Sequence, residues 1–555
     1  MAAVVLCTGA LSFFSAAFVD RYFEVSKNLD IFSSLFRQVN TVYVDSVDSG
    51  KLIQKGIDEM LESLDPYTTF IPESKADDFR FVTTGVYGGI GATIRMNGDY
   101  VCVSEPFEGF PAQKSDLRAG DKIIELDGNS MKGKTTNDIS RLLKGKPGTQ
   151  LVVIVQRNGE KTPLVKTLTR EEIKMKSVPY AGIVQEKIGY IRLTGFTEGT
   201  GNEVKEALKK LKQQQELSGV ILDIRGNPGG LLNEAVNVSN IFIAKGQEIV
   251  HTRGKLTDWN KTYKAINEAT DDKIPLVVLV SSGSASASEI VSGSLQDLDR
   301  AVILGQRTYG KGLVQTTRPL SFNTQVKITS AKYYIPSGRC IQALDYTHRN
   351  ADGSVGKIPD SLKTEYRTAG GRKVYDGGGI LPDIALEGTS VSGITATLLS
   401  KNLVFDYATS YRETHASIAP ATSFRLGATD FDAFQKFIAS AATDYTTGSE
   451  REMVNVKKSM EEEKYYPNLK DEAEALQKKI TETKKAAVSA NKEEIVRKIK
   501  EEIASRYYYQ VGRIEVSIQD DPEILKAAEI LKSPEWYRSI LDGTYKPVEE
   551  AKTTR

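Results

Sequence analysis

Hydrophobic positions change their spacing several times along the chain, and each change marks a different predicted element. Apolar residues recur at helical spacing from Ile31 to Leu64. Asp65-Pro66 interrupts this pattern, because proline disfavours a helical conformation at the residue before it. We therefore predict that residues 20–83 form an N-terminal helical region.

From residue 84 onward the apolar runs become short and are separated by glycine-containing turns. Candidate strands lie at 90–94, 100–103, 122–126 and 151–155. A short helix is predicted over 137–143, since Gly145 and Pro147-Gly148 close it. This pattern predicts a small, mostly β module over residues 84–175.

Over residues 176–394 largely apolar strands alternate with amphipathic helices. The predicted strands lie at 188–193, 220–224, 275–280 and 301–304, and the predicted helices at 202–211, 231–243 and 287–295. Strands that are apolar on both faces and alternate with helices are typical of a largely parallel sheet covered by helices. We therefore predict an α/β core for this part of the chain.

The last part of the chain, residues 395–555, reads as mainly helical. Residues 450–506 are rich in Lys and Glu, but their apolar positions hold no steady heptad, so a solvated helical domain is favoured over a coiled coil. The predicted fold class is therefore multidomain: an N-terminal helical segment, a β module, an α/β core with a largely parallel sheet, and a C-terminal helical domain.

The first residues of the chain differ from all of these elements. Residues 1–19 are mostly apolar and contain no charged side chain, and Asp20 and Arg21 follow them. This is typical of the apolar part of a signal peptide or of a short membrane anchor, and Ala16-Ala17 offers small residues for cleavage. The usual preceding positive residues are missing, and a buried helix is the alternative. We expect export, and the sequence does not decide whether the segment is cleaved.

Composition narrows the classes of function. The chain has 555 residues, enough for roughly three or four domains. Its net charge of +1 lacks the basic excess of a nucleic-acid binder. Three cysteines give no disulfide framework, and no metal-binding spacing such as HExxH occurs. We expect no nucleic-acid partner, no metal and no cofactor.

A serine-rich turn follows the predicted strand at 275–280 and contains the candidate nucleophile Ser286. A strand-to-helix turn presents a side chain at the carboxyl edge of a sheet, where the sites of α/β proteins lie. The start of the next helix supplies N–H groups and a positive dipole end, which stabilise an oxyanion. A serine-rich helix cap would explain the same residues, so this segment alone leaves both interpretations open.

The second candidate is Lys311, which lies between Gly310 and Gly312 and between two strand-like runs. A lysine is ordinarily a solvated surface charge. Glycine on both sides, however, suggests that backbone packs tightly around it. A lysine held in an apolar site has a lowered pKa and can accept a proton near neutral pH, which is the requirement for a serine–lysine dyad.

Histidine is the usual alternative base, and the chain has three: His251, His348 and His415. His251 lies on a strand-like run and could approach Ser286. No Gly-x-Ser-x-Gly turn or other triad signature accompanies it. His348 and His415 are more simply surface residues. A histidine base therefore stays the less favoured alternative.

The chain resembles the C-terminal processing peptidases, also called tail-specific proteases, from about Leu35 to Ile384. Several ordered blocks carry this resemblance and are more specific than a lone motif. The blocks are Leu222 to Gly230, Gly283 to Glu289, Ala301 to Gly305, Gly310 to Gln315, Lys332 to Arg339 and Gly379 to Ile384. Residues 395–555 match no motif, and Arg225-Gly226-Asn227 stands where many members have Arg-Asn-Asn.

The resemblance implies roles for individual residues. Ser286 matches the nucleophile of the family and Lys311, 25 residues later, its general base. Gln315 matches a residue that orients the lysine, and the backbone N–H groups of Gly230 and Ala287 would form the oxyanion hole. Such a donor contributes about 2.7–4 kcal/mol to transition-state stabilisation in other proteases. Glu289 and Asp297 also match family positions, where we expect structural roles.

The β module over residues 84–175 resembles a PDZ domain. Tyr87-Gly88-Gly89-Ile90-Gly91 is similar to its carboxylate-binding loop, whose N–H groups capture the C-terminus of a peptide that adds a strand to the sheet. A simple glycine turn is the alternative. In the family this module binds apolar C-termini of substrates and can gate access to the dyad.

The resemblance therefore implies a serine endopeptidase of the bacterial periplasm, either free or anchored to the inner membrane through residues 1–19. It would bind proteins by their C-terminal tails and cleave them through an acyl-enzyme. Two alternatives remain: a non-catalytic PDZ scaffold, and a hydrolase that uses His251. The sequence leaves open the natural substrate and cleavage site, a possible homo-oligomer, the resting activity of the enzyme, and the role of the C-terminal helices.

Overall fold

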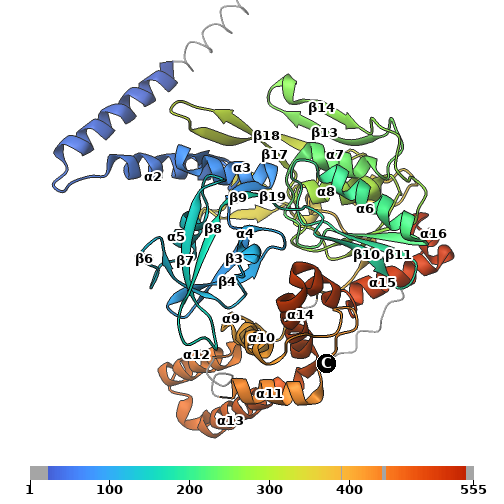
Figure 1. Ribbon diagram of the computed structural model, residues 1–555. Coiled ribbons are helices and arrows are strands. Elements are labelled where there is room, and N and C mark those ends of the chain that lie inside the picture. Colours follow the sequence, from blue (N-terminus) through green and yellow to red (C-terminus); the bar gives the residue numbers. More distant parts are fainter. Residues whose placement is uncertain (1–22, 389–390, 440–445, 546–555) are drawn as a thin grey trace, which may run out of the picture. The chain divides into compact units, whose positions relative to one another are not determined.

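A computed structural model of the protein describes residues 23–388, 391–439 and 446–545 (Figure 1). The chain divides into two compact units. The small unit contains residues 1–73 and 315–329, and the large unit contains residues 74–314 and 330–555. The expected signal or anchor segment, residues 1–19, lies outside the described residues.

The small unit is built mainly of helices, as predicted for the N-terminal region. A helix covers residues 23–42 and is followed by α2 (Ser49–Glu62), which begins where the Asp48 carboxylate accepts a hydrogen bond from the Lys51 N–H at 3.1 Å. β1 (Thr69–Ile71) then pairs antiparallel with the first residues of β18 (Gln325–Tyr334).

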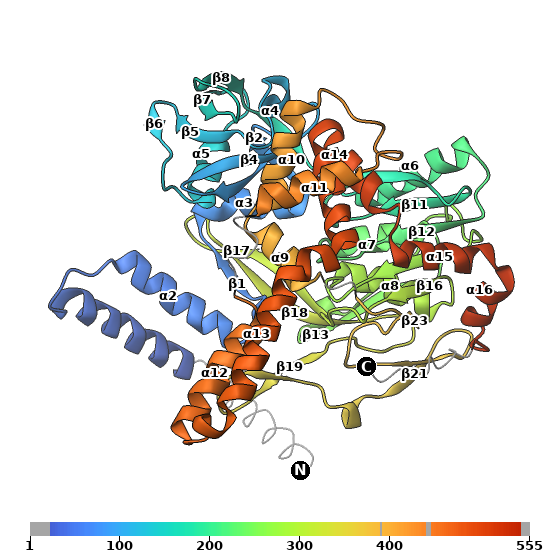
Figure 2. The ribbon, with the colours of Figure 1, turned by 90° about the horizontal axis from the view of Figure 1, so that it is seen from below.

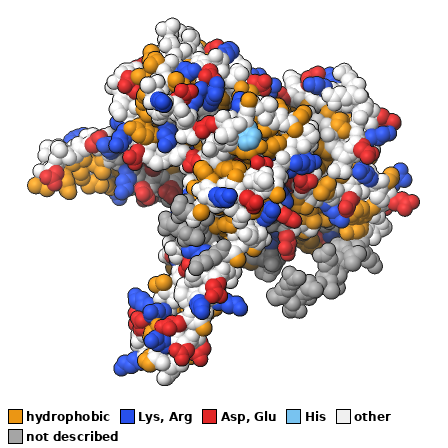
Figure 3. All heavy atoms as spheres, turned by 60° about the horizontal axis from the view of Figure 1, so that its bottom comes forward, with side chains coloured by type: hydrophobic (Ala, Val, Ile, Leu, Met, Phe, Trp, Pro, Cys, Tyr) orange, Lys and Arg blue, Asp and Glu red, His pale blue; other side chains and the backbone are white. Residues whose placement is uncertain are grey.

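The helices of the small unit expose many large apolar side chains, which form an orange area at the left of Figure 3. Examples are Leu29, Ile31, Phe32 and Leu35, each at least half exposed. Even so, none of the helices within the described residues is both long enough and apolar enough to span a bilayer.

The β module occupies the start of the large unit. Its elements are α3 (Ala76–Thr84), β2 (Val86–Gly89), β3 (Ala92–Asn97), β4 (Tyr100–Pro106), α4 (Pro111–Lys114), β5 (Lys122–Leu126), β6 (Asn129–Ser130), α5 (Thr136–Leu143), β7 (Gln150–Gln156), β8 (Leu164–Thr169) and β9 (Glu171–Lys174). The main sheet has the order β3-β4-β5-β7-β8, while β2 pairs with β9. β3 is therefore an edge strand in the described part of the module, and α5 packs beside it.

The α/β core contains the predicted, largely parallel sheet. Its strands are β10 (Tyr180–Val184), β11 (Ile188–Arg192), β12 (Gly219–Asp223), β15 (Leu276–Val280), β16 (Val302–Gly305) and β23 (Ile384–Ala385), in the order β10-β11-β12-β15-β16-β23. β10 is antiparallel to β11, and the other neighbours run parallel. The prediction from continuous apolar strands is confirmed.

Helices cover both faces of this sheet, which explains why its strands carry apolar side chains on both faces. α6 (Thr200–Gln214), α7 (Leu232–Asn240) and α8 (Ala287–Asp297) pack on the face that includes Leu222 and Val278. α15 (Pro522–Lys532) and α16 (Pro534–Leu541), which come from the far end of the chain, pack on the face that includes Ile221 and Val277 (Figure 2).

Further strands belong to smaller sheets outside this one. They are β13 (Glu248–Gly254), β14 (Lys261–Lys264), β17 (Leu313–Pro319), β19 (Leu344–Arg349), β20 (Val355–Lys357), β21 (Glu365–Arg367) and β22 (Lys373–Tyr375). A buried ion pair fastens the segment after β18 to the end of α8, where Arg339 Nη2 lies 2.8 Å from Asp297 Oδ1. Asp297 thus has the structural environment expected for it.

Helices dominate the C-terminal region, as predicted. They are α9 (Gly393–Ser400), α10 (Leu403–Thr414), α11 (Ala428–Ile438), α12 (Gly448–Glu462), α13 (Tyr466–Ala490) and α14 (Lys492–Ser517). Phe431, Phe434, Ile495 and Ile499 form part of their buried core. α12 and α13 are mostly exposed and carry mixed Lys, Arg, Asp and Glu side chains (Figure 3).

Charged side chains connect α14 to the β module. Arg513 Nη2 donates to Glu105 Oε2 on β4 at 3.0 Å, and Arg513 Nη1 donates to Glu502 Oε2 at 2.6 Å. Arg506 donates to the other oxygen of Glu502 at 2.8 Å. Burial alone would raise the pKa of the Glu502 carboxyl, but Arg506 and Arg513 lower it to about 2.

Replacing Glu502 by Gln is expected to destabilise the protein in a pH-dependent way. The pKa of Glu502 falls from 4.5 to about 2 on folding, so its ionised form stabilises the fold above pH 4.5 and this contribution is lost as the pH falls toward 2. The shift corresponds to at most about 3 kcal/mol. Urea unfolding of the parent and Glu502→Gln proteins should show a difference in stability that is greatest above pH 4.5 and shrinks below it. A difference independent of pH would contradict the ion-pair explanation.

Candidate active site

Ser286 lies in the turn between β15 and α8, with an unusual backbone conformation (φ 55°, ψ −111°). A positive φ is strained for a residue other than glycine, and such strain persists only where surrounding contacts hold it. Two contacts do so here. The Tyr333 hydroxyl donates to the Ser286 carbonyl at 3.2 Å, and the Ser286 N–H donates to Glu289 Oε2 at 2.9 Å.

Glu289 connects this turn with the turn that contains Lys311. Its side chain is fully buried. Oε2 accepts hydrogen bonds from the N–H groups of Ser286 and Lys311, both at 2.9 Å, while Oε1 accepts from the Gly310 N–H at 2.7 Å and from the Thr308 hydroxyl. Burial raises the pKa of the Glu289 carboxyl, and these four donors oppose the rise. One carboxyl group therefore holds the backbones of both candidate catalytic residues.

The glycines beside Lys311 lie against other backbone. A methyl group at Gly310, where φ is 89°, would lie 2.4 Å from the Ala343 Cβ, and one at Gly312 would lie 2.8 Å from the Gln342 N. The sequence-based expectation of tight packing around the lysine is confirmed for both neighbours. The backbone of Lys311 is thus held by the packing of both neighbouring glycines and by the hydrogen bond of its own N–H to Glu289.

The glycine turn after β12 packs against Ser286. Buried Asn227 organises this turn: its side-chain oxygen accepts the Gly229 N–H at 2.9 Å, and its carbonyl accepts the Ala285 N–H at 3.0 Å. A methyl group at Gly229, where φ is 102°, would lie 2.9 Å from the Ser286 Cβ and 3.0 Å from the Ala287 N. The turn therefore lies directly against the start of α8, where helix geometry leaves the first N–H groups without intrahelical acceptors.

These contacts bring Ser286, Ala287 and the Gly229-Gly230 turn together, with the Lys311 backbone joined to them through Glu289. Gln315, expected to orient the lysine, lies on β17 and belongs to the small unit, where its amide donates to Thr329 Oγ1 at 3.3 Å. Its proposed role stays a prediction.

His251, the alternative base, lies on β13 with other partners. Its Nδ1 lies 2.7 Å from Glu248 Oε1, and its ring stacks on Tyr334. Its Nε2 is buried and has no hydrogen-bond partner among the described residues, so neither ring nitrogen is hydrogen-bonded to Ser286. The geometry does not favour a histidine base.

The predicted carboxylate-binding residues lie at one end of the β module's edge strand. Tyr87, Gly88 and Gly89 belong to β2, which pairs with β9, and Ile90 and Gly91 lead into β3. A cavity of about 250 Å³ opens here between β3 and α5. Its apolar lining includes Phe81, Tyr87, Ile90, Ile94, Phe107 and Leu143. An extended peptide beside an edge strand can pair with it and place a side chain in such a cavity.

Glu289 has the structural role expected for it, whereas the role of Asn227 in the glycine turn was not predicted. Glu289 holds the start of α8 and nearby backbone, as expected, and the spacing Ser286-x-x-Glu289 is that of a helix capping box, which indicates the bond to the Ser286 N–H. No local signal identifies Asn227 as the organiser of the glycine turn.

Three family models match successive parts of the chain. The PDZ domain matches residues 88–165, Peptidase family S41 matches residues 187–348, and a family described as "Probable PDZ-protease, C-terminal helical domain" matches residues 394–531.

Individual proteins match as well. A carboxy-terminal-processing protease from Bartonella bacilliformis is 41% identical over 325 residues, which are 58% of this chain and 74% of the relative. A probable CtpA-like serine protease from Staphylococcus aureus is 36% identical over 317 residues, 57% of this chain and 62% of the relative. The solved structure of a photosystem II D1 C-terminal processing protease is 29% identical, with a TM-score of 0.35, over 65% of this chain and 93% of its own.

Proposed function

Because the chain belongs to peptidase family S41 and is a protease with a PDZ domain, we propose that it is an endopeptidase that binds the C-terminal tails of proteins and cleaves them with Ser286 and Lys311. The observation that carries this proposal is the buried Glu289 carboxyl, which binds the backbone N–H groups of both residues. A fully buried carboxyl with four donors is difficult to explain as a simple helix cap, since a cap needs only the first of these bonds.

In this mechanism the neutral Lys311 amine accepts the proton of the Ser286 hydroxyl as Oγ attacks the scissile carbonyl. The N–H groups of Ala287 and Gly230 donate to the resulting oxyanion. The intermediate collapses to an acyl-enzyme, and the lysine ammonium gives its proton to the leaving amine. Water then attacks the acyl-enzyme with Lys311 again as base, which restores Ser286. Gln315 orients the lysine.

Tail recognition belongs to the PDZ domain. The C-terminal carboxylate of the substrate would be bound at Tyr87 to Gly91, and its last apolar side chain would fill the cavity between β3 and α5. The apolar lining of that cavity supports a preference for apolar C-termini. An extracytoplasmic location and membrane association stay proposals, because both depend on residues 1–19, which lie outside the described residues. A homo-oligomer is likewise a proposal.

The proposal is tested with one unfolded substrate protein that ends either in an apolar tail or in the same tail terminated by two aspartates. We expect mass spectrometry to show cleavage of the apolar-tailed form at least about tenfold faster, since charge at the last positions does not fit an apolar cavity. A fluorophosphonate, which forms a covalent adduct with an activated serine, should label the tryptic peptide that contains Ser286.

The outcomes separate the alternatives. Equal cleavage of both tails would contradict recognition by the PDZ domain. A label on another residue would contradict Ser286 as nucleophile. Tail binding without cleavage or label would identify a PDZ scaffold instead of an enzyme.

A further inference from the structure

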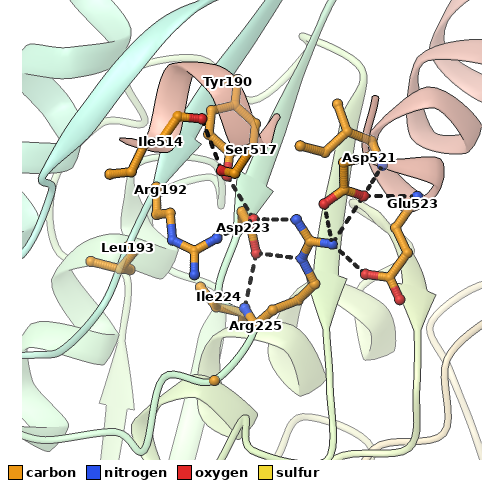
Figure 4. A network of polar contacts seen from close by, with 12 residues as sticks. Tyr190, Arg192, Leu193, Asp223, Ile224, Arg225, Ile514, Ser517, Asp521 and Glu523 are labelled. Atoms are coloured by element: carbon orange, nitrogen blue, oxygen red, sulfur yellow. Dashed lines mark hydrogen bonds and ion pairs between the residues drawn. The ribbon is translucent and has the colours of Figure 1, made fainter. Parts of the chain in front are cut away.

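Two acidic side chains from the end of the chain bind an arginine beside the glycine turn of the active site. Asp521 and Glu523 lie at the start of α15, and both point at the guanidinium of Arg225 (Figure 4). Arg225 Nη1 lies 2.9 Å from Asp521 Oδ2 and also bonds Glu523 Oε2. The side chains of Arg225 and Glu523 are only 16% and 7% exposed, so water screens this contact weakly.

Arg225 is also bound to the last residue of β12. Its backbone N–H and its Nε donate to Asp223 Oδ1 at 3.0 and 2.9 Å, and its Nη2 donates to Asp223 Oδ2 at 2.7 Å. The same carboxylate accepts from the Tyr190 hydroxyl at 2.7 Å and from Arg192 at 3.1 Å. Arg225 therefore fixes the point at which the chain leaves the sheet and enters the turn that leads to Gly229 and Gly230.

Asp521 and Glu523 accept hydrogen bonds from Arg225 Nη1, the nitrogen of the guanidinium that does not bind Asp223. Asp223 already accepts five hydrogen bonds, which exceeds the roughly four lone-pair positions of a carboxylate. The described bonds of Arg225 Nη1 go to Asp521 and Glu523. Arg192 and Arg225 both pair with the one buried carboxylate of Asp223. The carboxylates of Asp521 and Glu523 supply the further negative charge that balances the two guanidinium groups.

We propose that Asp521 and Glu523 are positioning residues for peptide-bond hydrolysis: by holding Arg225 they keep the Gly229-Gly230 turn against Ser286, so that the Gly230 N–H points at the developing oxyanion. This inference rests on the proposed function, because it concerns the same oxyanion hole. It assigns a part in the reaction to residues almost 300 positions away from the turn they support.

The attachment of α15 to the sheet does not depend on the ion pairs with Arg225, so a positioning role can be tested separately from a structural one. α15 is attached to the sheet by Ile524, Ala527 and Leu531, which are buried against the face that includes Ile221. The helix start is capped by Asp521 itself, whose Oδ1 accepts the N–H groups of Glu523 and Ile524. Asparagine caps a helix as well as aspartate, so Asp521→Asn removes the charge and keeps the cap.

The experiment compares the parent enzyme with Asp521→Asn/Glu523→Gln and with Glu529→Gln. Glu529 lies on the same helix, is 61% exposed and pairs only with Lys526 among its described ion pairs, which makes it a matched control for loss of charge. We expect the double variant to lower kcat for the tailed substrate about 10- to 100-fold, since a small displacement of a catalytic group has effects of this size. KM should change little. The midpoint of thermal unfolding should fall, because Arg225 loses two partners, so kcat is measured at a temperature at which both proteins are fully folded. The rate of fluorophosphonate labelling should fall with kcat, and the control should match the parent.

The results distinguish the inference from the proposed function. A parent enzyme that neither cleaves nor labels would overturn both. If the parent is active, three results for the double variant would overturn the inference and leave the proposed function intact. Its kcat could stay within twofold of the parent, its loss of activity could equal its unfolded fraction, or the change could appear in KM alone. If the double variant does not fold, Asp521→Asn and Glu523→Gln are read singly by the same criteria.

Discussion

Lys311→Arg is expected to reduce kcat for a tailed substrate by about a thousandfold or more, although arginine is also a long, basic side chain. A guanidinium cannot be deprotonated in a protein, so arginine cannot take the proton of Ser286. General-base catalysis contributes about 10²- to 10⁴-fold, and an unactivated serine is a poor nucleophile besides. Initial rates measured by mass spectrometry would check this, with Lys311→Ala beside it, and both variants should bind the tail normally.

Lys209→Arg on α6 is the matched control, because Lys209 is exposed and pairs with Glu206. It should leave the rate unchanged. Substantial activity in Lys311→Arg would show that the charge of this residue matters and its basicity does not. Activity that survives Lys311→Ala and disappears in His251→Ala would instead establish the imidazole as base.

Gly229→Ala should reduce kcat by about 10²- to 10³-fold, the usual effect of losing one oxyanion donor. The added methyl group would lie 2.7 Å from the Ala285 carbonyl oxygen and 2.9 Å from the Ser286 Cβ, so the turn must move away from α8. The Gly230 N–H would move with it. Steady-state kinetics should show most of the loss in kcat, because an oxyanion donor stabilises the transition state more than the bound substrate.

Gly226→Ala provides a matched control within the same turn. Gly226 also has a positive φ, 69°, but a methyl group there would meet no atom within 4 Å. Both variants therefore carry the conformational strain of a left-handed alanine, about 1–2 kcal/mol, and only Gly229→Ala collides with the site. Equal losses in the two variants would mean that strain, and not displacement of the turn, explains the effect.

Local patterns predicted the sheet and the two catalytic candidates. The run Val220 to Leu222 is apolar at every position because one set of side chains meets α6 to α8 and the other meets α15. Such a run is recognisable from sequence because burial on both faces makes every position of the strand apolar, whichever helices bury it. The roles of Ser286 and Lys311 were assigned because both lie in motifs that resemble those of the protease family. The structure adds that the backbones of both residues bind the same Glu289 carboxyl.

Other parts of the site have no local signal. Asp521 caps α15 and Pro522 lies in its first turn, a local pattern typical of the start of a helix. The same pattern cannot say that the carboxylate of the cap also meets Arg225. Likewise, the apolar positions of α15 predict a buried face, but a helical periodicity does not name the surface that buries it. Contacts between residues so distant in sequence depend on the whole fold.

The position of α15 and α16 also sets the order in which the molecule can be completed. Ile221, Val277 and Leu279 are buried beneath these helices, yet all three are synthesised more than two hundred residues earlier. One face of the central sheet therefore stays uncovered until residues 522–541 are present to cover it. The protease consequently cannot complete its core before these last two helices have been made and have docked on the sheet.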